Sequence, residues 1–192
     1  MFYQSRKRVN MKTLKPCLSL LAVVFAGTLV GCSTKSTKSV DVSDQIRSTL
    51  DQAGFKDVSS SQDRDKGVET LGGHVVAEGD KSQAESIARS IAGAQVVSNQ
   101  IAVIPPGAER DALRVNSDLD KGIESNLDAA LIRDRLHESV KYSVKNHVVT
   151  LTGEVDSQSK RSRAEEVAEA VVNVHQVVNE LQVKGQKASS SN

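Results

Sequence analysis

The stretch VVTLTGEV at residues 148–155, together with VETLGGHV at residues 68–75, decides the fold of this chain. Each stretch is the centre of a longer repeat, because residues 66–103 and 146–183 align without a gap and share twelve of 38 amino acids. Upstream of each stretch, apolar residues recur at every fourth position, which is the spacing of one helical face. They are Val42, Ile46 and Leu50 in the first repeat and Ile123, Leu127 and Leu131 in the second. The sequence therefore predicts two copies of one small domain.

The order of elements is clearest in the second copy, where the hydrophobic period changes from helical to alternating and back. The predicted elements are a helix over about 119–136, a strand over 140–144, a turn at 145–147, a strand over 148–155, a second helix beginning near Asp156 or Ser157, and a last strand over 177–183. The topology is α-β-β-α-β, which makes the fold class α+β: two tandem small domains, each a three-stranded sheet with two helices on one face. The other face is expected to contact water, at Thr150, Thr152, Gln176, Glu180 and Gln182.

Differences between the copies carry further predictions. Gly153 lies on the packed face of its strand, where the missing side chain allows a close approach. The second helix of each copy should end at Gly93 or Asn173, the two residue types that best adopt the left-handed position after a helix. The first copy is the weaker one, because it has Glu69 where an aliphatic residue is expected and because its first strand is hardly visible around residues 55–61.

The N-terminal segment predicts export. Five basic residues precede an apolar run at 18–26, which is the order of a secretory signal and is too short to span a membrane as a helix. The run is followed by LVGC at residues 29–32, which resembles the lipobox of bacterial lipoproteins. That resemblance implies that Cys32 receives a diacylglycerol and an amide-linked acyl chain such as palmitate, and two chains anchor firmly. An ordinary cleavage site with an incidental cysteine is the alternative, and translation starts at either Met1 or Met11.

These features divide the chain. We expect a signal peptide at 1–31, a polar tether at 32–39, a first domain at 40–104, a linker at 105–117, a second domain at 118–185 and a disordered tail at 186–192. Pro105 and Pro106 break both hydrophobic periods and therefore mark the linker.

Composition excludes several classes of function. Without residues 1–31 the chain carries 20 basic and 24 acidic residues, a formal charge of −4, which argues against a nucleic-acid partner. Cys17 would be lost with the signal, so Cys32 has no cysteine with which to form a disulfide. No catalytic triad, phosphate-binding loop or metal-ligand spacing is present, and the four histidines read as surface residues. The sequence thus predicts no catalytic residue, metal or cofactor.

The second copy resembles the BON domain family along its whole length, through the strand at 148–155, Arg161, Ala164 to Ala168, and VVNELQV at 177–183. A lipoprotein signal before two such domains is similar to the dual-BON outer-membrane lipoproteins of bacteria. The resemblance implies a non-enzymatic module that binds phospholipid and supports the envelope under osmotic or detergent stress. Ser33, in place of an aspartate that would favour the inner membrane, points to the outer membrane and a periplasmic location.

Two groups of residues are candidates for contact with anionic phospholipid. Ile132 lies off the packed helical face and is followed by Arg133 and Arg135, an arrangement that can dip into a headgroup layer. Lys160, Arg161 and Arg163 gather at the start of the second helix of copy two, where cations oppose the helix dipole. A solvated surface with one stray aliphatic residue is the alternative for the first group. The rival function is an adaptor that docks an envelope or peptidoglycan-associated protein partner.

Overall fold

The computed structural model describes residues 38–185, which include both repeats. Within this range, both copies belong to one compact unit. The expected signal peptide, Cys32 and the tail at 186–192 lie outside the described residues, so the structure does not test them.

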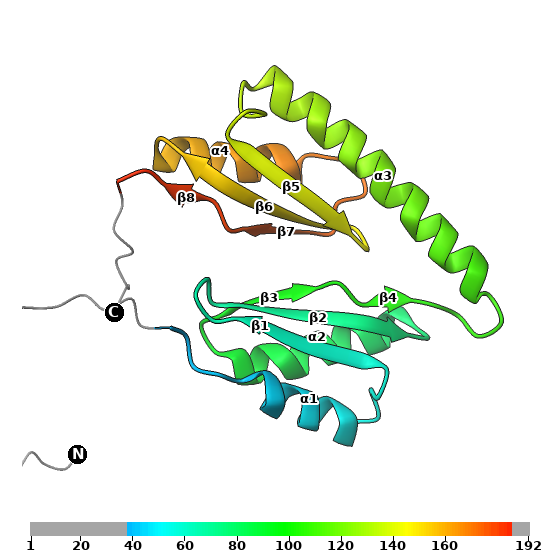
Figure 1. Ribbon diagram of the computed structural model, residues 1–192. Helices are drawn as coiled ribbons and strands as arrows, with labels where there is room; N and C mark the ends of the chain where they lie inside the picture. Colours follow the sequence, from blue (N-terminus) through cyan, green and yellow to red (C-terminus); the bar gives the residue numbers. More distant parts are fainter. Residues whose placement is uncertain (1–37, 186–192) are drawn as a thin grey trace, which may run out of the picture. The chain divides into compact units, whose positions relative to one another are not determined.

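The first copy folds in the predicted order, with one strand divided in two (Figure 1). Its elements are α1 (Ser43–Gln52), β1 (Val58–Asp63), β2 (Val68–Val75), α2 (Glu78–Ala92), β3 (Val96–Asn99) and β4 (Ala102–Val103). The second copy repeats them as α3 (Glu109–Arg133), β5 (Val140–Lys145), β6 (Val148–Val155), α4 (Gln158–Glu169), β7 (Gln176–Asn179) and β8 (Gln182–Val183). The predicted α+β class and the two tandem domains are therefore confirmed.

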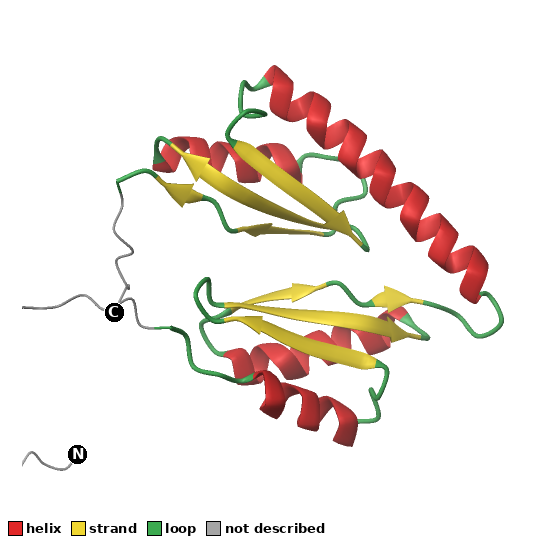
Figure 2. Cartoon of the chain, in the orientation of Figure 1, coloured by secondary structure: helices red, strands yellow, loops and turns green. Residues whose placement is uncertain are grey.

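Each sheet is built on its central strand. In the second copy β5 pairs antiparallel with β6, while β7 and β8 pair parallel with β6 on its other side. The first copy has the same pairing and the same register, with β2 at the centre. In each copy both helices cover one face of the sheet, as the ribbon in Figure 2 shows.

An asparagine at the same position of both copies explains why the last predicted strand is divided. Asn179 accepts a hydrogen bond from the Leu181 N–H through Oδ1 at 3.2 Å, and donates through Nδ2 to Glu165 at 2.9 Å. Asn99 makes the same pair of bonds, to Ile101 and Glu85. Each asparagine therefore satisfies a backbone N–H at the point where the last strand is interrupted.

The core of each copy lies between the helices and the sheet. In the second copy it is a cluster that includes Leu127, Leu131, Val149, Leu151 and Ala168, all fully buried. The first copy has the equivalent cluster around Ile46, Leu50 and Leu71. Small aliphatic side chains make up the buried residues of both cores.

The first copy is more regular than its sequence indicates. β1 pairs with β2 over six residues, and the alternation of buried and exposed positions is the same as in β5 and β6. The first strand is thus as regular as its counterpart in the second copy, although the sequence around residues 55–61 indicates it only weakly. Glu69 occupies the place of Val149 in the sheet and is completely buried. Main-chain pairing, which needs no aliphatic side chain, preserves the strand despite this carboxyl.

Turns and caps follow the predicted residues closely. Asn146 and His147 form a two-residue hairpin loop with φ values of 48° and 68°, the left-handed pair that such tight turns require. Ser157 caps α4 by accepting a hydrogen bond from the Lys160 N–H at 3.3 Å. Gly93 and Asn173 both have positive φ, although α4 itself ends at Glu169, four residues before Asn173.

Gly153 allows the close approach that was expected. Its φ is +119°, and a Cβ at this position would lie 2.5 Å from the carbonyl oxygen of Ser139. A Cβ on Gly73, the same position in the first copy, would collide with the carbonyl oxygen of Asp57. The chain entering the first strand of each copy therefore needs glycine opposite it.

Helix α3 begins at Glu109, about ten residues earlier than predicted, and ends at Arg133 rather than 136. Most of the segment expected as a linker at 105–117 is therefore helical. Glu109 fixes the start by accepting a hydrogen bond from the Gly107 N–H at 3.0 Å, and an acidic first turn suits the helix dipole. Val115 and Leu119 continue the four-residue spacing of Ile123, Leu127 and Leu131, so the predicted start was too late, although both side chains are exposed.

The outer face of the sheets is not entirely wet. Val68, Val148 and Val178, which come from both copies, form a buried apolar cluster. Glu180 is only 10% exposed and pairs with Lys66 of the first copy at 2.5 Å. The expectation that this whole face contacts water is therefore wrong at Gln176 and Glu180, because a tandem neighbour contacts them. Gln182 is exposed, as predicted.

Candidate membrane-contact site

The C-terminal end of α3 presents one apolar side chain among charges. The helix buries Ile123, Leu127 and Leu131, and the next residue, Ile132, falls off that stripe and is 55% exposed. Arg133 beside it is also exposed. The sequence-based placement of Ile132 and Arg133 on an accessible surface is therefore what the structure shows.

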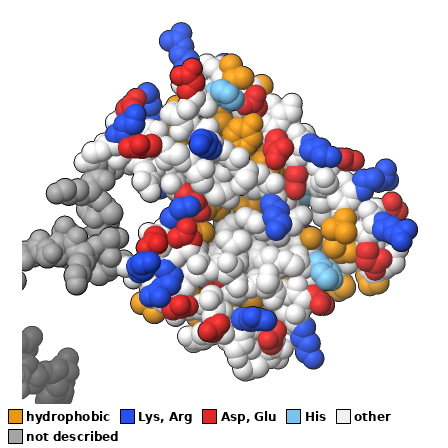
Figure 3. Space-filling model, in the orientation of Figure 1, with side chains coloured by type: hydrophobic (Ala, Val, Ile, Leu, Met, Phe, Trp, Pro, Cys, Tyr) orange, Lys and Arg blue, Asp and Glu red, His pale blue; other side chains and the backbone are white. Residues whose placement is uncertain are grey.

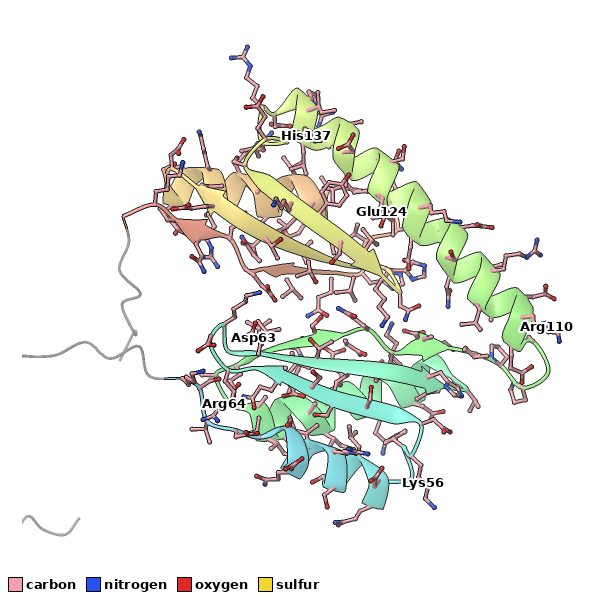
Figure 4. The ribbon with its side chains drawn as sticks, viewed as in Figure 1. Lys56, Asp63, Arg64, Arg110, Glu124 and His137 are labelled. Atoms are coloured by element: carbon pink, nitrogen blue, oxygen red, sulfur yellow. The ribbon has the colours of Figure 1, made fainter. Side chains whose placement is uncertain are left out.

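Arg135 lies in the turn just after α3. Its φ is +59°, and the corresponding residue of the first copy is Gly54, with φ +96°. A left-handed conformation costs a residue with a side chain roughly 1 kcal/mol. The same turn carries His137, which Figure 4 labels beyond the end of α3.

The second group of cations begins α4, and the structure joins it to the first group. Arg163 donates from Nε and Nη2 to Asp134 Oδ1, at 3.0 and 2.7 Å, and Asp134 directly follows α3. The hydrogen bond from Arg163 holds the pKa of Asp134 below its ordinary value. Ile132, Arg133, Arg135 and Arg163 thus surround one surface region, which we call the α3-end site.

Two of the predicted cations, Arg161 and Lys160, form contacts within the second copy. Arg161 donates from Nε to the Leu181 carbonyl at 3.0 Å and from Nη2 to the Asn179 carbonyl at 2.9 Å, so it stabilises the break between β7 and β8. Lys160 pairs with Asp156 at 2.6 Å. The start of α4 is therefore not an unbalanced cationic cluster, because nearby carboxylates and carbonyl groups engage all three cations.

Charges of both signs are interspersed around these residues. On the face that Figure 3 shows, Lys and Arg side chains alternate with Asp and Glu side chains. Asp134 and Glu166 both pair with Arg163, and Asp134 also lies 3.5 Å from Nε of Arg133, which is 76% exposed. Nearby carboxylates therefore balance part of the positive charge at this site.

A partly exposed group of three side chains at the end of α3 was not foreseen from the sequence. Tyr142 on β5 donates to Asp128 at 3.2 Å, and His137 Nδ1 lies 2.9 Å from the same carboxylate. Burial, followed by the hydrogen bond to Asp128, raises the pKa of Tyr142. This trio fixes the end of α3 against the edge of the sheet. Its one sequence signal is the position of Tyr142 on the packed side of an edge strand.

Two histidines that are far apart in the sequence lie close together in the structure, which their spacing along the chain did not indicate. The rings of His147 and His175 lie 4.8 Å apart, edge to face. Burial lowers the pKa of His147, and its Nε2 has no hydrogen-bond partner. Between residues 38 and 185, no three His, Cys, Asp or Glu side chains gather as potential metal ligands.

None of the helices between residues 38 and 185 has the length and apolar character needed to span a bilayer.

The chain is similar to several known proteins. The chain is 31% identical over 137 residues to osmotically-inducible protein Y of Escherichia coli (strain K12), an alignment that covers 70% of this chain and 67% of that protein. Two solved structures of CdsD, a structural protein of the type III secretion system of Chlamydia trachomatis, are similar at 14% identity. One covers 75% of this chain and 92% of its own, with a TM-score of 0.33. The other, the C-terminal domain, covers 77% and 99%, with a TM-score of 0.31.

The family assignment agrees with the repeat. The BON domain model matches residues 40–105 and 119–185, almost the same limits as the two predicted domains. These segments contain all strands of both sheets, the α-β-β-α-β order and the paired glycines and asparagines. The chain therefore belongs to the BON domain family.

Proposed function

We propose that this protein is a lipid-anchored, non-enzymatic component of the bacterial envelope that binds anionic phospholipid through the α3-end site. It is attached to the outer membrane at Cys32 and faces the periplasm. A role in tolerance of osmotic stress is supported by the similarity to an osmotically-inducible protein. The lipobox-like residues 29–32 support the anchor.

One observation carries the lipid-binding proposal: Ile132 is 55% exposed at the end of a helix, with Arg133 and Arg135 beside it. Such an aliphatic side chain can enter the headgroup layer, while the neighbouring guanidinium groups remain with the phosphates. Each cation near an anionic surface contributes about 1 kcal/mol. One aliphatic side chain and two cations give weak binding, which suits a protein that a covalent anchor already holds at the membrane.

Sedimentation with vesicles tests this proposal. The chain carrying Cys32→Ser is mixed with phosphatidylglycerol vesicles and with phosphatidylcholine vesicles, at low and at high salt. We expect salt-sensitive binding to the anionic vesicles, weakened at least tenfold by Arg133→Glu together with Arg135→Glu. Ile132→Asn should weaken binding at both salt concentrations.

A matched control lies on the same helix. Arg110→Glu with Arg114→Glu changes the same charge at the opposite end of α3, where both arginines are exposed (Arg110 is labelled in Figure 4). If the control pair weakens binding as much as the Arg133 and Arg135 pair, the α3-end site is not the contact. If the protein binds none of the vesicles but binds one envelope protein, the adaptor function replaces lipid binding.

A further inference from the structure

The first copy contains a pocket that the α3-end site does not include. It has a volume of about 510 Å³ and lies beside α1, the turn after it and the start of β1. Its walls are Arg47, Asp51, Lys56, Asp57, Val58, Ser59 and Ser60. Figure 4 labels Lys56 in the turn beyond α1. The pocket therefore lies at the place in copy one that corresponds to the end of α3 in copy two.

The charges in this pocket are balanced but not paired. Arg47 and Lys56 supply two cations, and Asp51 and Asp57 supply two carboxylates. Within residues 38–185, none of these four side chains forms an ion pair of 4 Å or less, whereas thirteen other contacts of that kind do form. Opposite charges that line one pocket without meeting each other remain available to an incoming molecule.

The second copy shows that the fold does not require this open arrangement. Aligned through the helices and the strand register, the positions of Arg47, Lys56 and Ser60 carry Asp128, His137 and Tyr142. In copy two these three side chains bond to one another, with Asp128 at the centre. In copy one a serine replaces the large tyrosine, and an arginine replaces the central carboxylate. The same location is thus closed by its own side chains in one copy and open in the other.

From this contrast we infer that the first-copy pocket binds a zwitterionic phosphoester headgroup, of the phosphoethanolamine kind. Its phosphate would lie against Arg47 and Lys56, and its ammonium group against Asp51 and Asp57. A ligand with only negative charge would leave the two carboxylates without a partner, so the pocket favours a molecule with both signs. Assigning this headgroup to a membrane lipid rests on the proposed function; the headgroup chemistry itself rests on the pocket.

Titration with soluble headgroups tests the chemistry without a membrane. Amide chemical shifts of the Cys32→Ser chain are followed by NMR as glycerophosphoethanolamine, glycerophosphoglycerol or inorganic phosphate is added. We expect saturable shifts within residues 47–60 for glycerophosphoethanolamine, with an affinity at least fivefold above that for the other two. Arg47→Gln and Asp51→Asn should each weaken that binding by about fivefold, since each removes one charge contact. Both changes are on exposed positions of α1 and should leave the fold intact.

Other results would overturn the inference. Equal binding of all three ligands would mean a general anion site, and the absence of saturable shifts near residues 47–60 would mean no site. A second experiment tests whether the bound headgroup comes from a membrane lipid. Adding phosphatidylethanolamine to phosphatidylglycerol vesicles should strengthen sedimentation of the chain but not of its Arg47→Gln variant. If both respond alike, the ligand is not a lipid headgroup. Because the soluble titration does not involve Arg133 or Arg135, the pocket and the α3-end site can fail independently.

Discussion

Replacing Glu69 by valine should stabilise the first copy. Glu69 is fully buried at the position that Val149 occupies in copy two. Its Oε1 is hydrogen-bonded to Ser60, while Oε2 has no partner. Burial is the main reason that the pKa of this carboxyl is raised above its ordinary value of 4.5. The buried carboxyl therefore weakens a core that is otherwise aliphatic.

The magnitude follows from three contributions to the free energy of unfolding. Removing an unsatisfied buried oxygen gains about 1–3 kcal/mol. Burying a valine side chain gains about 1.5–3 kcal/mol. Losing the bond between Ser60 and the carboxyl costs about 1 kcal/mol, because Ser60 still has the Ser43 carbonyl at 3.2 Å. The net gain is about 2 kcal/mol or more, which in a domain of this size raises the melting temperature by about 10 °C.

The gain should depend on pH. Because folding raises the pKa of Glu69, its contribution to stability is fully present below pH 4.5 and is lost as the pH rises through the native pKa. The advantage of Glu69→Val over wild type should therefore be larger at pH 7.5 than at pH 4.5. The reciprocal change Val149→Glu should destabilise copy two by at least about 2 kcal/mol, since it buries the same unpaired carboxyl.

Native-state hydrogen exchange on the whole chain is the assay, because it reads each copy separately. In wild type, amides of residues 68–75 should open at lower free energy than those of residues 148–155, and Glu69→Val should narrow the difference. Equal protection in the wild-type chain would show that copy one is not the weaker copy. A Glu69→Val variant that is neutral, or whose gain is the same at both pH values, would refute the argument from the buried carboxyl.

Three further changes have distinct expected results. Cys32→Ser should release the protein from membranes and leave an uncleaved precursor on an immunoblot, because lipid attachment precedes signal removal in lipoproteins; normal cleavage with full membrane retention would contradict the anchor. Arg135→Gly should raise the free energy of unfolding of copy two by about 1 kcal/mol in denaturant titrations, since φ is +59°, and should also weaken vesicle binding. Gly153→Ala should destabilise copy two by at least about 2 kcal/mol because its methyl group meets the Ser139 carbonyl; an unchanged denaturation midpoint would show that the entering chain can shift.

Local patterns predicted most of the fold. The repeat set the number of domains, and the change of period set the order of helices and strands. The turn at Asn146 and His147 and the cap at Ser157 could be read directly, since each depends on residues adjacent in sequence. The helical turns before residue 119 were missed although Val115 continues the helical spacing, because the prediction extended the linker from Pro105 and Pro106 as far as residue 117.

The candidate site was predictable only in part. Exposure of Ile132 follows from its place on the helix, but the partners of Arg161 and Arg163 do not. Arg163 meets a carboxylate 29 positions away, and Arg161 meets two carbonyl groups at a strand break that sequence alone shows as one strand. The first-copy pocket also could not be predicted from the sequence, because it depends on four charged side chains that do not form ion pairs with one another.

The Gln176 side chain has a consequence for solubility. Its Nε2 donates to the Val97 carbonyl at 2.6 Å, and its Oε1 accepts from the Asn99 N–H at 2.9 Å, so it occupies backbone groups on the edge strand β3. Bare strand edges are templates on which other chains can add and start aggregates. The same repeat position in copy one is Val96, whose side chain has no amide and cannot form the equivalent hydrogen bonds to the second copy. A single glutamine thus hinders the edge-to-edge pairing of β3 with strands of other molecules. The tandem chain has this protection, and the first copy alone would lack it.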